Sequence, residues 1–354
     1  MNILKLLKYV KDQEASDLHL KPGAPPTLRI HGRLTALEGA PELSAPDLET
    51  IFNSMTSKTQ QADFEQTGEL DFSYQTETDL RFRVNASQQR GEISLAFRRV
   101  SLEIPSVDEL QLPEICKTLA LKKQGLVLVT GPTGSGKSTT LAAMIEHLNQ
   151  RESRRIITVE DPIEFLYQDK ESFITQRELG TDTRSFAIAA QQALRQDPDV
   201  ILVGEMRDQA TMAACLTAAE TGHLVFSTLH TNNAPQSVDR LVDTFPPHQQ
   251  GQIRMQLSLT LQAVLAQRLL PRLDGRGRVP AVEVMLANNA VRNLIREGKT
   301  HQMKNVMQTG ADHGMQTMER ALEQLYRDGL ISIDAALANA NDPDILRSSL
   351  GTGA

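Results

Sequence analysis

The sequence predicts an α/β protein whose main domain contains a mostly parallel sheet, with a small α+β domain before it and a mainly helical region after it. Two observations predict this order. Within residues 1–100, short runs alternate apolar and polar residues, which is typical of antiparallel strands with one buried face. From residue 115 onward, near-continuous runs of Val, Ile and Leu alternate with helical patterns, which is typical of parallel strands buried on both faces.

The changes of pattern set the expected boundaries. We predict an N-terminal domain over 1–100, a linker with two prolines over 101–114, a main domain over 115–270 and a mainly helical region over 271–354. The first domain is expected to open with a helix and to contain another near 46–60. Its strands are expected in LRIHGRL, ELDFSYQ, LRFRV and EISLAFRRV. Beyond about residue 255 we expect mostly helix, interrupted at PRLDGRGRVP.

Composition excludes several classes of protein. The 354 residues carry a net charge of −7 and 4% aromatic residues without Trp, which disfavours a nucleic-acid partner. Cys116 and Cys215 lie about a hundred residues apart, so neither a Cys-rich zinc site nor a disulfide framework is expected. No apolar run approaches the roughly 18 residues of a membrane span, and the opening segment lacks a cleavage site. We expect a cytoplasmic protein without direct membrane insertion.

A phosphate-binding motif follows the strand-like run GLVLVT. GPTGSGKS (131–138) satisfies the P-loop pattern in full and precedes a helix-forming stretch, which is the context that the motif requires. The expected nucleotide contacts are Gly131, Pro132, Thr133, Gly134, Ser135, Gly136, Lys137, Ser138 and Thr139. Lys137 is expected to reach the β- and γ-phosphates, and the Ser138 hydroxyl to bind Mg²⁺. The sequence therefore predicts ATP and Mg²⁺ as cofactors.

Three further strand-like runs end in polar groups: Glu160 with Asp161, then Glu205, then His230. Because ligands bind outside the carboxyl ends of parallel strands, these groups and the P-loop should lie along one edge. Either Glu205 or Glu160, or both, would act on the metal or on the attacking water, with Glu205 reaching Mg²⁺ partly through water. Taken alone, His230 is more typical of a structural hydrogen bond at a strand end than of a functional group, and the evidence for His223 is weaker.

Arginines in the first domain are a further candidate group. Alternation puts Arg81 and Arg83 on one sheet face, opposite Phe82, and puts Arg98 opposite Phe97. A solvated surface is the ordinary interpretation of such a face. The other interpretation is that these arginines complete a nucleotide site, as arginines from a neighbouring element do in many NTPases.

With these residues identified, the chain resembles the twitching-motility retraction ATPases, the PilT family of type IV pilus motors within the secretion-ATPase superfamily. The resemblance runs nearly end to end. It is carried by SDLHL (16–20), RFRVN (81–85), the P-loop, ITVEDPIEF (157–165), RQDPDVILVGEMRD (195–208), TGHLVFSTLHTN (221–232) and AVRNLIREGK (290–299). Val291 stands where the family usually has Ile.

The resemblance implies a PAS-like first domain and a RecA-like P-loop ATPase domain. It implies a homohexamer at the cytoplasmic face of the inner membrane, bound to a pilus platform protein and accompanied by a retraction paralogue. It also implies that Arg81, Arg83 and Arg98 complete the nucleotide site, that Glu205 and Glu160 serve hydrolysis, and that His230 senses the γ-phosphate.

Other functions remain open at this point. They are an accessory retraction paralogue, a pilus extension or type II secretion ATPase, a RecA-like nucleic-acid translocase and a non-hydrolysing nucleotide-dependent scaffold. In AVRNLIREGK we expect a helix with Arg292 and Arg296 on one polar face. A solvated surface is its ordinary interpretation, whereas the resemblance implies a role in retraction.

Overall fold

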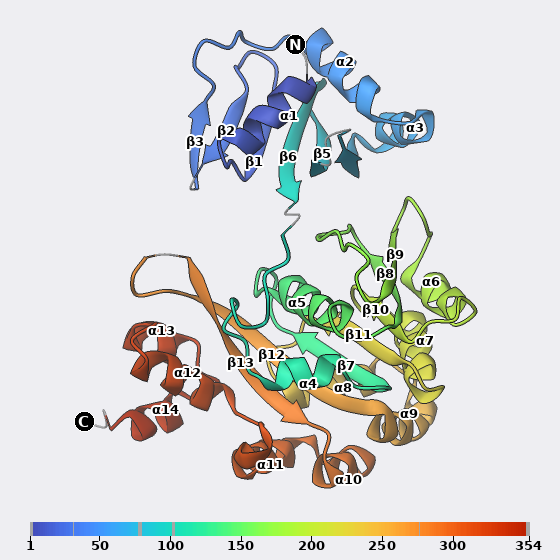
Figure 1. Ribbon diagram of the computed structural model, residues 1–354, viewed down its shortest axis with the longest axis vertical. Coiled ribbons are helices and arrows are strands. Elements are labelled where there is room, and N and C mark those ends of the chain that lie inside the picture. The colour runs from blue at the N-terminus through green and yellow to red at the C-terminus, as the bar shows by residue number, and fades with distance from the viewer. Residues whose placement is uncertain (1–2, 31, 77–79, 101–102, 276, 352–354) are drawn as a thin grey trace. The chain divides into compact units, whose positions relative to one another are not determined.

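The computed structural model describes residues 3–30, 32–76, 80–100, 103–275 and 277–351, and the chain divides into two compact units (Figure 1). Unit 1 comprises residues 1–102 and 164–166, and unit 2 comprises residues 103–163 and 167–354. The division falls inside the predicted linker, of which residues 101 and 102 lie outside the described residues. Each unit has a hydrophobic core of its own.

Unit 1 is built on a six-stranded antiparallel sheet in the order β3-β2-β1-β6-β5-β4. Its strands are β1 (Asp17–Leu20), β2 (Thr27–Ile30), β3 (Arg33–Ala36), β4 (Glu69–Gln75), β5 (Arg81–Gln89) and β6 (Glu92–Val100). Its helices are α1 (Ile3–Asp12), α2 (Ala45–Met55) and α3 (Lys58–Thr67). Leu7, Phe52 and Phe82 belong to the core shared by helices and sheet. The unit therefore has the α+β organisation that the alternation predicts, and its PAS-like character stays a prediction.

The single helix expected near residues 46–60 is instead two helices. Ser57 has an extended backbone (φ −76°, ψ 163°), so a continuous helix cannot pass through it. Its side chain caps α3 in a capping box with Gln60, as Ser44 caps α2 with Asp47. The spacing of Ser57 and Gln60 in the sequence is the signal that marks this second start.

Unit 2 contains a seven-stranded sheet in the order β13-β12-β7-β11-β10-β8-β9. Neighbouring strands are parallel except for the edge pair of β12 and β13. The strands are β7 (Gly125–Thr130), β8 (Arg155–Glu160), β9 (Phe173–Glu178), β10 (Val200–Val203), β11 (Leu224–Leu229), β12 (Leu261–Pro271) and β13 (Arg278–Leu286). The expected mostly parallel sheet is confirmed.

Helices cover both faces of this sheet (Figure 1). On one face, α4 (Ile115–Ala120) and α5 (Lys137–Asn149) share a core with Val127 and Val129. On the other, Leu126 and Leu128 share a core with α6 (Phe186–Ala193), α7 (Gln209–Glu220), α8 (Ala234–Asp243) and α9 (Pro247–Thr260). Successive strand residues point to opposite faces, so a strand buried on both sides must be apolar throughout.

The expectation of mostly helix beyond about residue 255 is wrong between residues 261 and 286. β12 and β13 form a long antiparallel hairpin there, and the predicted boundary at residue 270 falls inside it. The main sheet therefore continues to Leu286. The Leu, Ala, Gln and Arg residues of β12 favour helix by intrinsic propensity, but pairing with the buried strand β7 overrides that preference.

The remainder of the described chain, residues 287–351, is helical as expected. Its helices are α10 (Asn289–Glu297), α11 (Met303–Thr309), α12 (Met318–Arg327), α13 (Ile333–Ala338) and α14 (Pro343–Leu350). Leu322, Ile331 and Leu346 pack with Val279 and Leu270 in a separate small core. Within the described ranges, no helix combines the length and the apolar composition needed to cross a membrane.

Arg292 of α10 does not lie on a solvated face. It donates to backbone carbonyl groups around the end of α9 and the start of α10. These acceptors are Ser258 (2.6 Å), Leu259 (2.8 Å), Leu261 (3.1 Å) and Ala287 (2.8 Å). The last carbonyls of a helix lack partners within the helix, so Arg292 supplies donors that α9 would otherwise miss. The interpretation of this face as a solvated surface is therefore wrong for Arg292, whereas Arg296 is exposed and donates to Asn293.

We expect Arg292→Ala to lower the free energy of unfolding of unit 2 by about 2 kcal/mol, because these carbonyl groups lose a charged donor. Arg296→Ala is the matched control and should stay within about 0.5 kcal/mol of the unsubstituted chain. Urea unfolding of both purified variants measures the difference. Equal stabilities would show that Arg292 does not hold the end of α9.

Candidate active site

Four parallel strands of unit 2 end at one edge of the sheet, and the predicted site residues follow these ends (Figure 1). Along the edge, β7 leads into the P-loop, β11 into His230 and β10 into Gly204 and Glu205, and β8 ends at Glu160. The register pairs Thr130 with Leu229, and Val203 with both Ser227 and Val159. The predicted convergence of these groups is therefore present.

The P-loop turns tightly between β7 and α5. Gly131, Gly134 and Gly136 have φ values of +144°, +79° and +87°, which other residues rarely adopt. A Cβ atom on Gly131 would lie 2.3 Å from the Gln267 carbonyl oxygen, so the loop has no room for a side chain there. Gly136 leads directly into α5, and the unpaired N–H groups of a helix N-terminus attract phosphate.

Polar groups of the loop are suited to an anionic ligand. The Lys137 ammonium donates to the carbonyl oxygens of Gly131 (3.0 Å) and Pro132 (3.1 Å), which holds the cation within the loop. The Ser135 hydroxyl is buried and has no hydrogen-bond partner in the described part of the chain. A phosphate oxygen would satisfy such a group. Thr133 and Ser138 are exposed, and Thr139 is half-buried.

Gln267, which our sequence reasoning missed, holds the loop from the neighbouring strand β12. Its side-chain amide donates to the Ser135 carbonyl oxygen (2.8 Å), and its side-chain oxygen accepts from the Thr140 hydroxyl (2.7 Å). Gln267 is 3% exposed, so both ends of its amide depend on these partners. The helical interpretation of residues 261–271 concealed this role, which depends on the pairing of β12 with β7.

Glu205 is largely buried, with a side chain that is 13% exposed, and both of its oxygens face nitrogen atoms. Oε1 lies 2.6 Å from the guanidinium of Arg207, and Oε2 lies 3.4 Å from Nε2 of His230. The preceding Gly204 is held by the Val159 carbonyl oxygen (2.8 Å) and by the Thr228 hydroxyl (2.7 Å). Glu205 therefore starts from a fixed backbone. Our sequence reasoning did not single out Arg207.

Glu160 is half-buried, and neighbouring side chains orient it. Its Oε1 accepts hydrogen bonds from the Thr158 hydroxyl (2.7 Å) and from the Gln176 amide (3.2 Å). Its negative charge adds to the burial that raises the pKa of Tyr167 well above the usual value. One oxygen of Glu160 thus accepts two hydrogen bonds from neighbouring side chains. The two partners of Glu205 are more exposed, since the side chain of Arg207 is 72% exposed and that of His230 is 49% exposed.

The two histidines considered in this region lie at opposite ends of β11. His230 follows the carboxyl end and is at the edge that carries Glu205. His223 precedes the strand, and its Nδ1 lies 3.0 Å from the Ala218 carbonyl oxygen and 3.1 Å from the Thr221 hydroxyl. His223 therefore helps to end α7 and has no place at the phosphate edge.

The three predicted arginines share one face of the sheet of unit 1, opposite its core. Arg83 and Arg98 are directly opposite each other in the pairing of β5 with β6, while Arg81 begins β5. Arg98 donates to Asp17 (2.9 Å). Burial opposes ionisation of Asp17, but hydrogen bonds from Ser16 and Arg98 hold its pKa below the usual value. The three arginines lie on one face of the sheet, as predicted. Their catalytic role stays a prediction.

A cavity of about 620 Å³ opens beside the P-loop, within unit 2. Gly136, Thr139 and Thr140 line one side, and Leu269 and Arg272 of the β12 region line another. This volume is in the range of small-molecule sites in proteins, and its position extends the phosphate edge. A base and sugar attached to a phosphate in the P-loop could occupy it.

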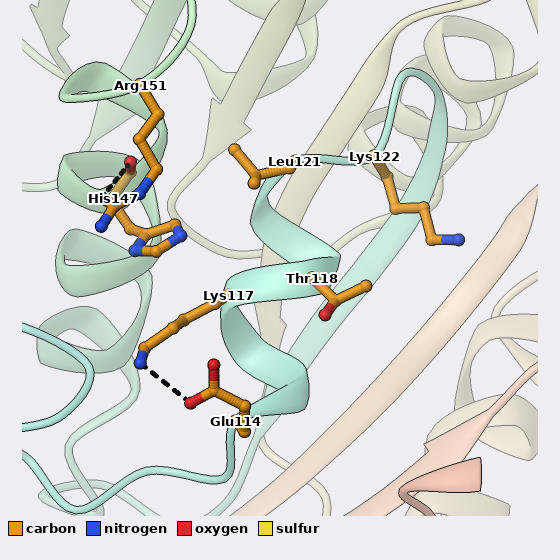
Figure 2. A pocket seen from close by; sticks show the side chains of 7 residues that line it. All are labelled: Glu114, Lys117, Thr118, Leu121, Lys122, His147 and Arg151. Carbon is orange, nitrogen blue, oxygen red and sulfur yellow. Dashed lines mark hydrogen bonds and ion pairs between the residues drawn. The ribbon is translucent and has the colours of Figure 1, made fainter.

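Another cavity, of about 610 Å³, lies between α4 and the C-terminal half of α5 (Figure 2). It is basic at first sight, since Lys117, Lys122, His147 and Arg151 line it. Figure 2 shows the Lys117 ammonium directed at Glu114 (2.8 Å), and it also pairs with Asp108 (2.7 Å). The charge of Lys117 is therefore already balanced by carboxylates, and none of the predicted site residues lines this cavity.

Residues 3–338 match the family described as type II/IV secretion system proteins. The chain belongs to this family. It is 45% identical to the type IV pilus retractation ATPase PilT of Pseudomonas aeruginosa, over 97% of this chain and 99% of that protein. It is 42% identical to the type IV pilus ATPase PilU of the same organism, over 100% of this chain and 92% of that protein.

A crystal structure of the pilus retraction motor PilT with bound ADP superposes on the chain with a TM-score of 0.92. The sequences are 47% identical, and the match covers 98% of this chain and 99% of that one. These comparisons confirm the resemblance to the pilus retraction ATPases and the α/β fold class.

We expect Glu205→Gln to retain nucleotide binding and to lose turnover by about 100-fold or more, because shape is kept while the carboxylate charge is lost. Glu160→Gln should cost less, since Thr158 and Gln176 can still orient the side chain. Phosphate release measures turnover in each variant, and binding of a fluorescent nucleotide shows whether the nucleotide still binds. Near-normal turnover in Glu205→Gln together with a large loss in Glu160→Gln would transfer the main role to Glu160.

Proposed function

We propose that the chain is an ATP-hydrolysing motor that drives retraction of type IV pili in twitching motility. The observation that carries this proposal is the match to a pilus retraction ATPase over nearly the whole of both chains. The P-loop, the two glutamates and His230 occur together at one edge of the sheet, which supports hydrolysis rather than nucleotide binding alone.

ATP is the proposed substrate, and the residues of the P-loop hold its phosphates. Backbone N–H groups from Thr133 to Thr139 would donate to phosphate oxygens, and Ser135 Oγ would gain the partner that it lacks among the described residues. Lys137 would place its charge between the β- and γ-phosphates. The cavity beside Thr140 and Leu269 would take the base and sugar.

Magnesium fits the donors present at this edge. The Ser138 hydroxyl would bind it directly and Glu205 partly through water. Within the described ranges, no group of three or more His, Cys, Asp and Glu side chains could hold a metal ion. A P-loop site needs no such group, because Mg²⁺ there retains several waters and phosphate oxygens. When bound, Mg²⁺ neutralises charge on the β- and γ-phosphates.

We infer the remaining roles from the residue types at this edge. Glu205 and Glu160 would divide the work, one orienting the metal's water and the other accepting the proton of the attacking water. His230 lies beside Glu205, where it would sense the γ-phosphate. Arg81, Arg83 and Arg98 would complete the nucleotide site in an assembled ring and stabilise charge that develops in the transition state.

Assembly and location belong to the same proposal. We infer a homohexamer in the cytoplasm, at the inner membrane through a pilus platform protein. The second candidate function is that of an accessory retraction paralogue. The 42% identity with PilU over the full chain supports this candidate. A nucleic-acid translocase is disfavoured by the net charge of −7 and the 4% aromatic content.

Expression of the chain in a strain that lacks its retraction ATPase is expected to restore twitching, and Lys137→Ala is expected to abolish it because the γ-phosphate loses its main cation. Lys122→Ala removes an exposed lysine away from the P-loop and serves as the matched control. Twitching zones and phosphate release from purified protein are the paired measurements, the latter with and without duplex DNA.

Twitching with Lys137→Ala would contradict the motor function. If the chain supports twitching only in a strain that keeps its own retraction ATPase, the chain is the accessory paralogue instead. Strong stimulation of phosphate release by DNA would favour the translocase.

A separate prediction concerns the arginines of unit 1. If they act on the nucleotide of an adjoining subunit, mixing Arg81→Ala chains with Lys137→Ala chains should restore part of the activity, because some interfaces then contain an intact site. Phosphate release over a series of mixing ratios measures the recovery, with each variant alone as the baseline. A flat response at every ratio would mean that Arg81 acts within its own chain or has no catalytic role.

A further inference from the structure

Arg207 makes a contact that the proposed chemistry does not use. It follows Glu205 by two residues, in the segment that connects β10 to α7. Its guanidinium lies 2.6 Å from Glu205 Oε1 and forms an ion pair with it. In the described part of the chain, no other ion pair or hydrogen bond of the Arg207 side chain is present.

The two partners differ in how firmly they are held. The Glu205 side chain is 13% exposed, and its backbone follows a glycine bound to both neighbouring strands. The Arg207 side chain is 72% exposed and is anchored only through the carboxylate. The guanidinium can therefore leave without disturbing packing, whereas Glu205 cannot move away from the sheet edge.

The contact has a consequence for any divalent cation at this edge. Glu205 Oε2 faces His230, so Oε1 is the oxygen that Arg207 occupies. An arginine has only donors and stays charged in a protein, so the guanidinium takes up one side of this oxygen and repels a cation that approaches it. Binding of Arg207 therefore opposes binding of a metal at Oε1.

We propose that Arg207 is a positioning residue that competes with the divalent metal for the Glu205 carboxylate. The competition makes occupation of Glu205 depend on the metal arriving with nucleotide phosphates, which together outweigh one exposed guanidinium. Arg207 thereby limits metal binding at Glu205 in the absence of a nucleotide. This inference rests on the proposed function, because it takes Glu205 as a group that reaches the metal.

The test measures metal binding directly. Mn²⁺ serves as the probe and ADP as the nucleotide, and free Mn²⁺ is followed by electron paramagnetic resonance. We expect Arg207→Ala to tighten Mn²⁺ binding in the presence of ADP by about three- to fivefold, as for the loss of one largely exposed ion pair. Binding of ADP without metal should be unchanged. Arg207→Lys should return the Mn²⁺ affinity toward that of the unsubstituted chain, because it restores the positive charge.

Two controls separate competition from a general change of charge. Arg184→Ala removes another exposed arginine, two residues before the start of α6. It should leave Mn²⁺ binding unchanged. In a chain that carries Glu205→Gln, adding Arg207→Ala should also change nothing, because the shared carboxylate is already absent.

Unchanged or weaker Mn²⁺ binding by Arg207→Ala would overturn the proposal, as would an equal gain in the Glu205→Gln background. Weaker binding of metal-free ADP would instead make Arg207 a phosphate contact. If Arg207→Ala does not fold, Arg207→Gln keeps a side chain of similar length and carries the same expectation. Failure of the unsubstituted chain to bind ADP at all would contradict the proposed function, and is distinguishable from these outcomes.

Discussion

The parallel pairing of β11 with β7 on one side and β10 on the other is the constraint on which the site depends. It sets the P-loop, His230 and Glu205 side by side, since each follows the carboxyl end of one of these strands. The apolar runs that make the strands are buried on both faces, so slipping the register would move every one of these residues at once. The arrangement of these residues is therefore a consequence of the packing of the core.

Polar contacts between neighbouring strands refine this arrangement. Gln267 fixes the P-loop from β12, and Thr228 of β11 fixes the peptide before Glu205. On that fixed backbone, Glu205 lies between a histidine and an arginine that are both more exposed than it is. Glu205, which is expected to act on the metal or on the attacking water, is thus the more buried partner in both contacts.

How much the sequence predicts depends on the range of the interactions. The P-loop and the strand ends at Glu160, Glu205 and His230 follow from short local patterns, and these predictions agree with the fold. The β12–β13 hairpin was missed because its residues favour helix until β7 is available as a partner. Gln267 contacts a residue 132 positions away, and Arg292 one that is 34 positions away, so no local pattern could assign either role.

The most direct test of the central claim, that four strand ends form one ligand site, is hydrogen–deuterium exchange with and without Mg²⁺ and ADP. We predict that peptides containing residues 131–139, 204–207 and 230–233, and the end of β8, gain protection together and at the same ligand concentration. The segment around His223, at the other end of β11, should not change. Protection confined to residues 131–139 would contradict the account, because it would mean that Glu205, His230 and Glu160 do not belong to the nucleotide site.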